Sequence, residues 1–85
     1  MYDFLIKEFI DHLTKEDIKH LAKTNGIILN NKEINIIYPL LKKNWRTFYY
    51  GNPKKLLEQL KKELKDETFN KIEALYIQLK NKLDN

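Results

Sequence analysis

Positive charge is concentrated in residues 42–65, a segment that carries eight of the 16 lysines and arginines against only two acidic residues. The stretch 45–50 within this segment reads WRTFYY, so aromatic rings lie among the cations. Such side chains bind anionic partners, because cations neutralise phosphate or carboxylate groups while aromatic rings stack or bury apolar area. The residues predicted to contact a partner are Lys42, Lys43, Trp45, Arg46, Tyr49, Tyr50, Lys54 and Lys55.

Two interpretations of this segment are open. In the first, the aromatic rings anchor the core of a small domain and the lysines form a solvated helix face. In the second, the segment binds nucleic acid, although its single arginine, Arg46, offers little for base recognition. We therefore expect a non-enzymatic interaction module that binds a protein partner or a second copy of itself. Nucleic-acid binding through residues 42–65 is the alternative.

Residue types that perform catalysis or hold cofactors are scarce. The chain has no serine and no cysteine, which excludes the corresponding nucleophiles as well as disulfides and thiolate metal sites. His12 and His20 lack the i, i+4 spacing of a helical metal site. The two glycines, Gly26 and Gly51, are too few and too far apart for a phosphate-binding loop. We expect no enzyme activity, no metal, no cofactor and no small-molecule substrate.

The first half of the chain contains strong signals for helix boundaries. Apolar residues recur at helical spacing over residues 2–12, which predicts an amphipathic helix. Thr14 and Asp17 have the spacing of a capping box, so a second helix is expected over 15–25. Gly26 should end this helix, because glycine adopts the left-handed conformation without a steric penalty.

A third helix is predicted to begin at residue 31. Asn30 and Glu33 repeat the capping-box pattern, and Pro39 should kink the helix because proline removes one helical hydrogen bond. Asn44 is the expected end of this helix. The aromatic and β-branched stretch 45–50 favours extended chain, although the apolar spacing also allows one helix that continues to Phe48.

Two further helices are predicted in the last third of the chain. Asn52 followed by Pro53 is typical of a helix start, so a helix is expected over 53–65. Asp66 can cap a final helix over 67–83. The sequence thus predicts an all-α fold, a compact bundle of four to five short helices in a single domain over residues 1–85. Its core should include Leu21 and Leu60.

The sequence also predicts where the protein is located. The start of the chain, MYDFLIKEF, lacks the basic residues and the unbroken apolar run of a signal peptide. The longest stretch without a charged or amide side chain, residues 36–41, is six residues long, whereas a membrane span needs roughly 20. We therefore expect no membrane association and a cytoplasmic protein.

A resemblance adds to this interpretation. It rests on the opening amphipathic helix, on LTKEDIKHLAKTNGIILNNKEINIIYPLL (residues 13–41), and on NPKKLLEQLKKEL (52–64) followed by FNKIEALYIQL (69–79). The chain resembles a small uncharacterised all-helical family, a domain of unknown function, of low-GC Gram-positive bacteria. The resemblance implies a short cytoplasmic bacterial protein and carries no functional residues. Pro39 and the WRTFYY stretch are unusual for that family.

Overall fold

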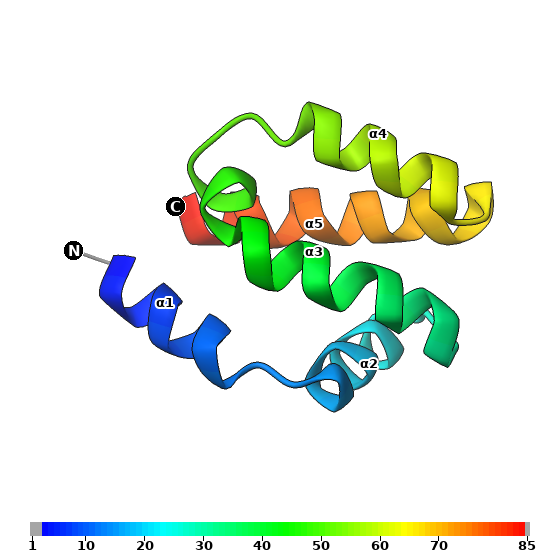
Figure 1. Ribbon diagram of the computed structural model, residues 1–85, viewed down its shortest axis with the longest axis horizontal. Coiled ribbons are helices and arrows are strands. Elements are labelled where there is room, and N and C mark those ends of the chain that lie inside the picture. Colours follow the sequence, from blue (N-terminus) through cyan, green and yellow to red (C-terminus); the bar gives the residue numbers. More distant parts are fainter. Residues whose placement is uncertain (1–2, 85) are drawn as a thin grey trace.

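The computed structural model describes residues 3–84, and these form five α-helices without a strand. The all-α prediction is confirmed. Figure 1 shows the helices in chain order, with α3 at the centre of the molecule. Their bounds are α1 Asp3–His12, α2 Lys15–Thr24, α3 Asn31–Tyr49, α4 Lys54–Glu63 and α5 Asp66–Asp84. Within residues 3–84, no helix combines the length and apolarity that a bilayer crossing requires.

Both predicted capping boxes are present. Thr14 Oγ1 accepts from the Asp17 amide at 3.1 Å, and Asp17 Oδ2 accepts from the Thr14 amide at 2.9 Å. Asn30 and Glu33 exchange the same pair of bonds at 2.8 and 2.9 Å. These bonds satisfy amides that the first turn of a helix leaves without partners, so α2 and α3 begin where the sequence predicts.

The end of α2 also follows the prediction. Gly26 has a φ of 80°, and its amide donates to the Lys23 carbonyl at 3.0 Å. The Ile27 amide reaches back to the Ala22 carbonyl at 2.8 Å. This is the Schellman arrangement, in which a left-handed glycine reverses the chain and satisfies the last helical carbonyls. The reversal also buries Ile27 and Ala22 in the core.

The kink in α3 lies at Asn44 and not at Pro39, where the sequence predicted it. Asn44 has the one non-helical backbone conformation in α3, with φ −119° and ψ 23°. Its side-chain Nδ2 donates to the Leu40 carbonyl at 3.0 Å, which is the i−4 acceptor of a helical amide. A side chain that enters the helical ladder in this way bends the helix. Pro39 is exposed and the helix continues through it.

The preference for extended chain over residues 45–50 is wrong, because α3 continues to Tyr49. Trp45 and Phe48 keep the helical spacing of Leu41 and face inward. Phe48 is buried, and its ring meets the Tyr76 ring edge-on at a centroid distance of 5.7 Å. These contacts override the β-propensity of the stretch, which measures fit to a pleated surface that is absent here.

The starts of the last two helices differ slightly from the prediction. Pro53 immediately precedes α4 and accepts from the Leu57 amide at 2.8 Å, while Asn52 Oδ1 accepts from the Lys54 amide at 3.1 Å. Asp66 is the first residue of α5 and not its cap, since the Phe69 amide donates to the Lys65 carbonyl at 2.8 Å. An acidic residue in the first turn still favours the helix through its dipole.

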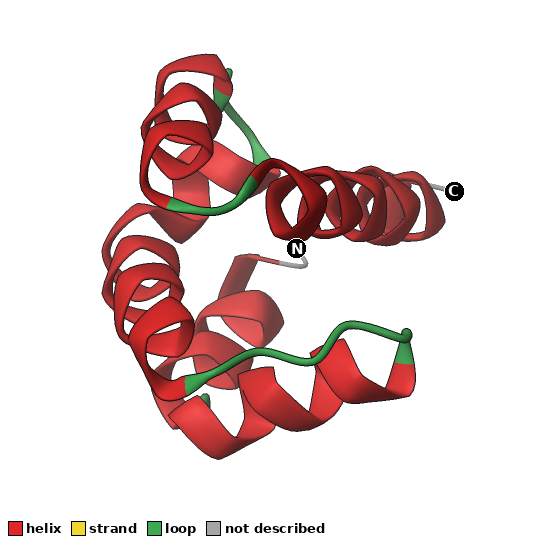
Figure 2. Cartoon of the chain, turned by 90° about the vertical axis from the view of Figure 1, so that its right-hand side faces the viewer, coloured by secondary structure: helices red, strands yellow, loops and turns green. Residues whose placement is uncertain are grey.

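The core consists of two clusters of buried side chains on either side of α3. One is formed mainly by α2, the loop after it and the start of α3; the other is formed by Leu60, Leu64 and Phe69. Ile37 and Ile72 contact both clusters. Seen from the side in Figure 2, the helices form an open arc, in which α2 and α5 lie on opposite arms. No side chain of the described residues is more than 98% buried, so the core is thin.

Candidate functional site

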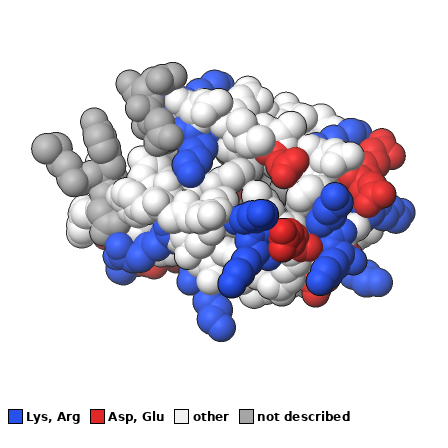
Figure 3. Space-filling view, turned by 90° about the horizontal axis from the view of Figure 1, so that it is seen from above, with Lys and Arg blue, Asp and Glu red and all other residues white. Residues whose placement is uncertain are grey.

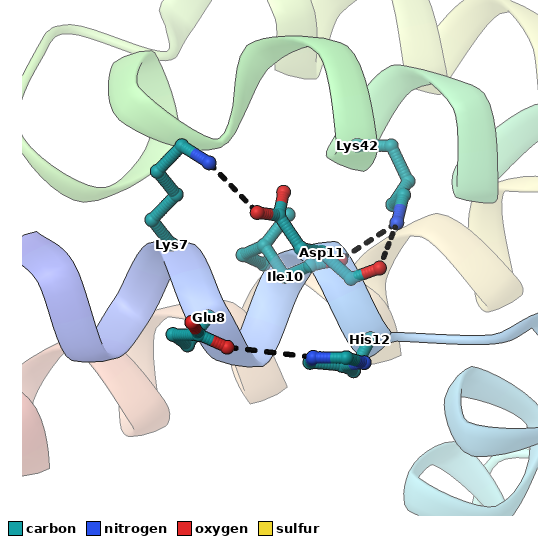
Figure 4. Close-up of polar contacts among 6 residues, drawn as sticks. All are labelled: Lys7, Glu8, Ile10, Asp11, His12 and Lys42. Carbon is teal, nitrogen blue, oxygen red and sulfur yellow. Dashed lines mark hydrogen bonds and ion pairs between the residues drawn. The ribbon is translucent and has the colours of Figure 1, made fainter.

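Lys42, the first of the predicted partner-binding residues, attaches α1 to α3. Its Nζ donates to the Ile10 carbonyl at 2.7 Å and to the Asp11 carbonyl at 3.2 Å (Figure 4). Carbonyls in the last turn of a helix lack their usual partners, and the helix dipole favours a cation there. The charge of Lys42 is therefore used within the chain.

Replacing Lys42 with methionine tests this structural role. The variant keeps most of the aliphatic stem and removes the ammonium, so we expect the free energy of unfolding to fall by about 1.5–3 kcal/mol, as for hydrogen bonds to charged groups. Lys43→Met is the matched control, because Lys43 is exposed, and its effect should stay within about 0.5 kcal/mol. Urea denaturation monitored by circular dichroism measures both. Equal effects of the two substitutions would contradict the role of Lys42.

Trp45 and Arg46 lie next to each other on the surface of α3. Trp45 is partly buried and packs against the first core cluster. The guanidinium of Arg46 lies over the Trp45 ring, with Cζ 4.7 Å from the centroid. Trp45 therefore packs against the core, and Arg46 covers one face of its ring. For Trp45, this placement agrees with the interpretation in which the aromatic rings anchor the core.

The remaining predicted residues lie at the end of α3 and the start of α4. Lys43, Tyr50, Lys54 and Lys55 are exposed, and the rings of Tyr49 and Tyr50 meet edge-on at 4.5 Å. In Figure 3, which views the molecule from the α4 side, acidic side chains lie among the basic ones. The basic residues on this face thus do not form an unbroken patch.

A groove that the sequence analysis did not identify lies between α2 and α5, with α3 behind it. Its cavity volume is about 170 Å³. Its lining consists of fifteen residues: Ile18, Leu21, Ala22, Ile27, Leu29, Ile37, Leu40, Leu41, Phe48, Leu57, Leu60, Ile72, Leu75, Tyr76 and Leu79. Every lining side chain except Tyr76 is purely hydrocarbon. The Tyr76 hydroxyl donates to the Phe48 carbonyl, so it is satisfied internally.

Leu21 shows how the groove departs from the predicted core. The sequence placed Leu21 inside, but its side chain lines the groove and is 42% exposed. The neighbours Ile18 and Ala22 on the same helix are buried. The prediction fails for Leu21 because α5 does not close over α2. The sequence signal was present as an apolar stripe, but a stripe does not reveal whether a second helix covers it.

Two lysines of α5 lie near the groove. Lys80 Nζ is 5.9 Å from the centroid of the Tyr76 ring, which lines the groove. Lys71 lines a neighbouring hollow that shares Ile27 and Leu75 with the groove. Lys71 also forms an ion pair with Glu67, at 3.4 Å. Lysine side chains therefore flank an apolar site.

Helix α1 presents a second apolar surface. The side chains of Phe4, Leu5 and Phe9 are 67%, 62% and 63% exposed. We call these three residues the outer edge of α1. The other apolar residues of the helix, Ile6 and Ile10, pack against the first core cluster. Exposed apolar residues grouped in this way are typical of interaction surfaces.

The polar residues of α1 form two exposed pairs (Figure 4). Lys7 donates to Asp11 Oδ2 at 2.7 Å, and this bond raises the pKa of Lys7 and lowers the pKa of Asp11. His12 Nε2 lies 3.4 Å from Glu8 Oε2. Among the described residues, no group of three or more histidine or acidic side chains is arranged to hold a metal ion. Both pairs are solvated and contribute little to stability.

Comparison with family models, with curated proteins and with solved structures finds no match to this chain.

Proposed function

We propose that this chain is a non-enzymatic helical interaction module, and that its groove receives an amphipathic helix of a protein partner. The apolar groove between α2 and α5 is the observation that carries this proposal. The groove gains free energy when an apolar side chain displaces water from its leucine and isoleucine side chains, of which Leu21, at 42%, is the most exposed. Its single polar side-chain group already has a partner within the chain, so the groove offers little to a polar small molecule.

A helix suits the shape of this site better than an extended peptide. Helices α2 and α5 form the two sides of the groove, and their lining residues recur at helical spacing. An amphipathic helix can place its apolar face in such a groove and keep its polar face in solvent. The described residues contain no strand edge to which an extended peptide could add.

Nucleic-acid binding is the second candidate, supported by the exposure of Lys43, Lys54, Lys55 and Tyr50. Lys42 and Trp45 contribute less than the sequence suggested, because they make contacts within the fold. Acidic side chains between the basic ones on the face in Figure 3 also weaken attraction to phosphate.

A pull-down with matched variants tests the proposal. Leu21→Lys places a charge in the groove, and we expect it to reduce capture of a protein partner from cell lysate about tenfold or more, because an unpaired charge is costly in an apolar contact. Ile77→Lys is the matched control on α5, since Ile77 is 51% exposed and does not line the groove. Quantitative mass spectrometry compares the captured proteins.

A double charge reversal separates the two candidates. Lys54→Glu with Lys55→Glu should leave capture by the groove unchanged. If this variant loses the partner and Leu21→Lys retains it, the groove is not the site. A salt-sensitive electrophoretic shift of RNA or DNA that the double reversal abolishes would then favour nucleic-acid binding.

A further inference from the structure

We propose that the occupant of the groove is a second copy of this chain, whose α1 inserts its outer edge between α2 and α5. This inference rests on the proposed function and names the partner of the same site. Each copy carries both an outer edge and a groove, so a two-fold axis that brings them together gives two equivalent contacts. A closed dimer of this kind covers both the groove and the aromatic ring that enters it.

The size of the groove fits one aromatic ring. Its volume is about 170 Å³. An apolar cavity of about 150 Å³ in another protein holds one benzene molecule. The outer edge of α1 supplies two phenylalanines, Phe4 and Phe9, each more than 60% exposed. We assign the groove to Phe9, because it is the more central of the two in α1.

The exposed area of the chain is also what a dimer of this kind requires. The single copy exposes 6330 Å², whereas a compact monomer of 10.3 kDa exposes about 5,350 Å². The excess is roughly 1,000 Å², and a standard interface buries about 800 Å² on each partner. The thin core agrees with this comparison, since no described side chain is completely enclosed.

Charge favours α1 over a basic helix as the occupant. Among its described side chains, helix α1 carries two acidic residues, Glu8 and Asp11, against one lysine. The chain as a whole has a net charge of +4, so two copies repel each other unless opposite charges meet. Lys80 beside the groove provides the positive counterpart to this acidic helix, together with Lys71 when its exposed ion pair with Glu67 opens.

Analytical ultracentrifugation of the full chain tests the inference. We expect a wild-type dimer, and we expect Phe9→Glu to raise the dimer dissociation constant at least about 30-fold, as for the loss of a central aromatic contact. Leu21→Lys should have a similar effect from the other side of the contact. Ile28→Lys is the control, because Ile28 is 75% exposed and lies outside the groove. Circular dichroism verifies that each variant is folded.

A mixture of the two interface variants, Phe9→Glu and Leu21→Lys, provides a further test of the contact. In a mixed dimer, the Leu21→Lys copy inserts its native Phe9 into the intact groove of the Phe9→Glu copy. The other contact brings the introduced glutamate of one copy near the introduced lysine of the other, and these carry opposite charges. We therefore expect the mixture to dimerise more tightly than either variant alone, at least about tenfold.

Two results would overturn the inference. One is a wild-type chain that stays monomeric at millimolar concentration; the other is a dimer that Phe9→Glu and Ile28→Lys weaken equally. Neither result decides the proposed function, which depends on whether Leu21→Lys loses a protein that Ile77→Lys retains. If the chain is a monomer and captures a different protein through the groove, the proposed function stands and the proposed self-association is wrong.

Discussion

Replacing Leu60 with alanine is expected to lower the free energy of unfolding by about 2–5 kcal/mol. Leu60 is 3% exposed and forms the centre of the second core cluster with Leu64 and Phe69. Truncation removes apolar contact and leaves a cavity that α3, α4 and α5 cannot close without moving. Urea denaturation monitored by circular dichroism measures the change.

Leu21→Ala is the control that makes the Leu60 result informative. Both leucines occupy inward positions of an amphipathic stripe, so the sequence predicts the same cost for both. Leu21 borders the open groove, and we expect its loss to cost less than about 1 kcal/mol when extrapolated to low protein concentration. Equal costs for the two variants would mean that the groove is closed in solution.

Phe48→Ala should have an effect of comparable or larger size, about 3–5 kcal/mol. Phe48 is buried at the end of α3, where its ring meets Tyr76 of α5. Because its carbonyl also accepts the Tyr76 hydroxyl, Phe48 joins the two helices through both side chain and backbone. Thermal and urea denaturation should both show the loss.

Tyr76→Phe separates the hydrogen bond from the ring contact. This variant keeps the ring and removes only the hydroxyl, so a loss of about 0.5–1.5 kcal/mol is expected. A Phe48→Ala effect no larger than this value would mean that Phe48 is not a core residue. The extended arrangement of residues 45–50 would then have to be reconsidered.

The helix starts could be predicted because their physics is local. Thr14 with Asp17, and Asn30 with Glu33, satisfy one another's amides within a single turn, so four residues determine the outcome. Gly26 is similar, since its positive φ depends only on the lack of a side chain. Such signals need no knowledge of what packs against the helix.

The path of α3 could not be predicted in the same way. Pro39 is compatible with the helix here, whereas Asn44 bends it through a bond to the Leu40 carbonyl. The choice between helix and extended chain for residues 45–50 depended on contacts of Trp45 and Phe48 with distant parts of the chain. Local propensity carries no information about those contacts.

The candidate site was the least predictable part of the structure. Leu21, Leu75 and Leu79 have the spacing of core residues, and only the separation of α2 from α5 makes them a groove. Lys42 looked like a binding residue because of its basic neighbours, but carbonyls 31 and 32 residues away engage it. Whether an apolar residue is buried in the core or left at the surface is decided only when the helices pack together.

The arrangement around α3 has a consequence for how the chain folds. The main helix contacts join α1 with α3, α2 with α3, α3 with α4, and α4 with α5, so each helix meets one that is next, or next but one, along the chain. Short separations of this kind require little loop-closure entropy. Proteins with low contact order fold in microseconds to milliseconds. The route to the native state is therefore short, because each of these four main contacts joins helices that follow one another closely along the chain.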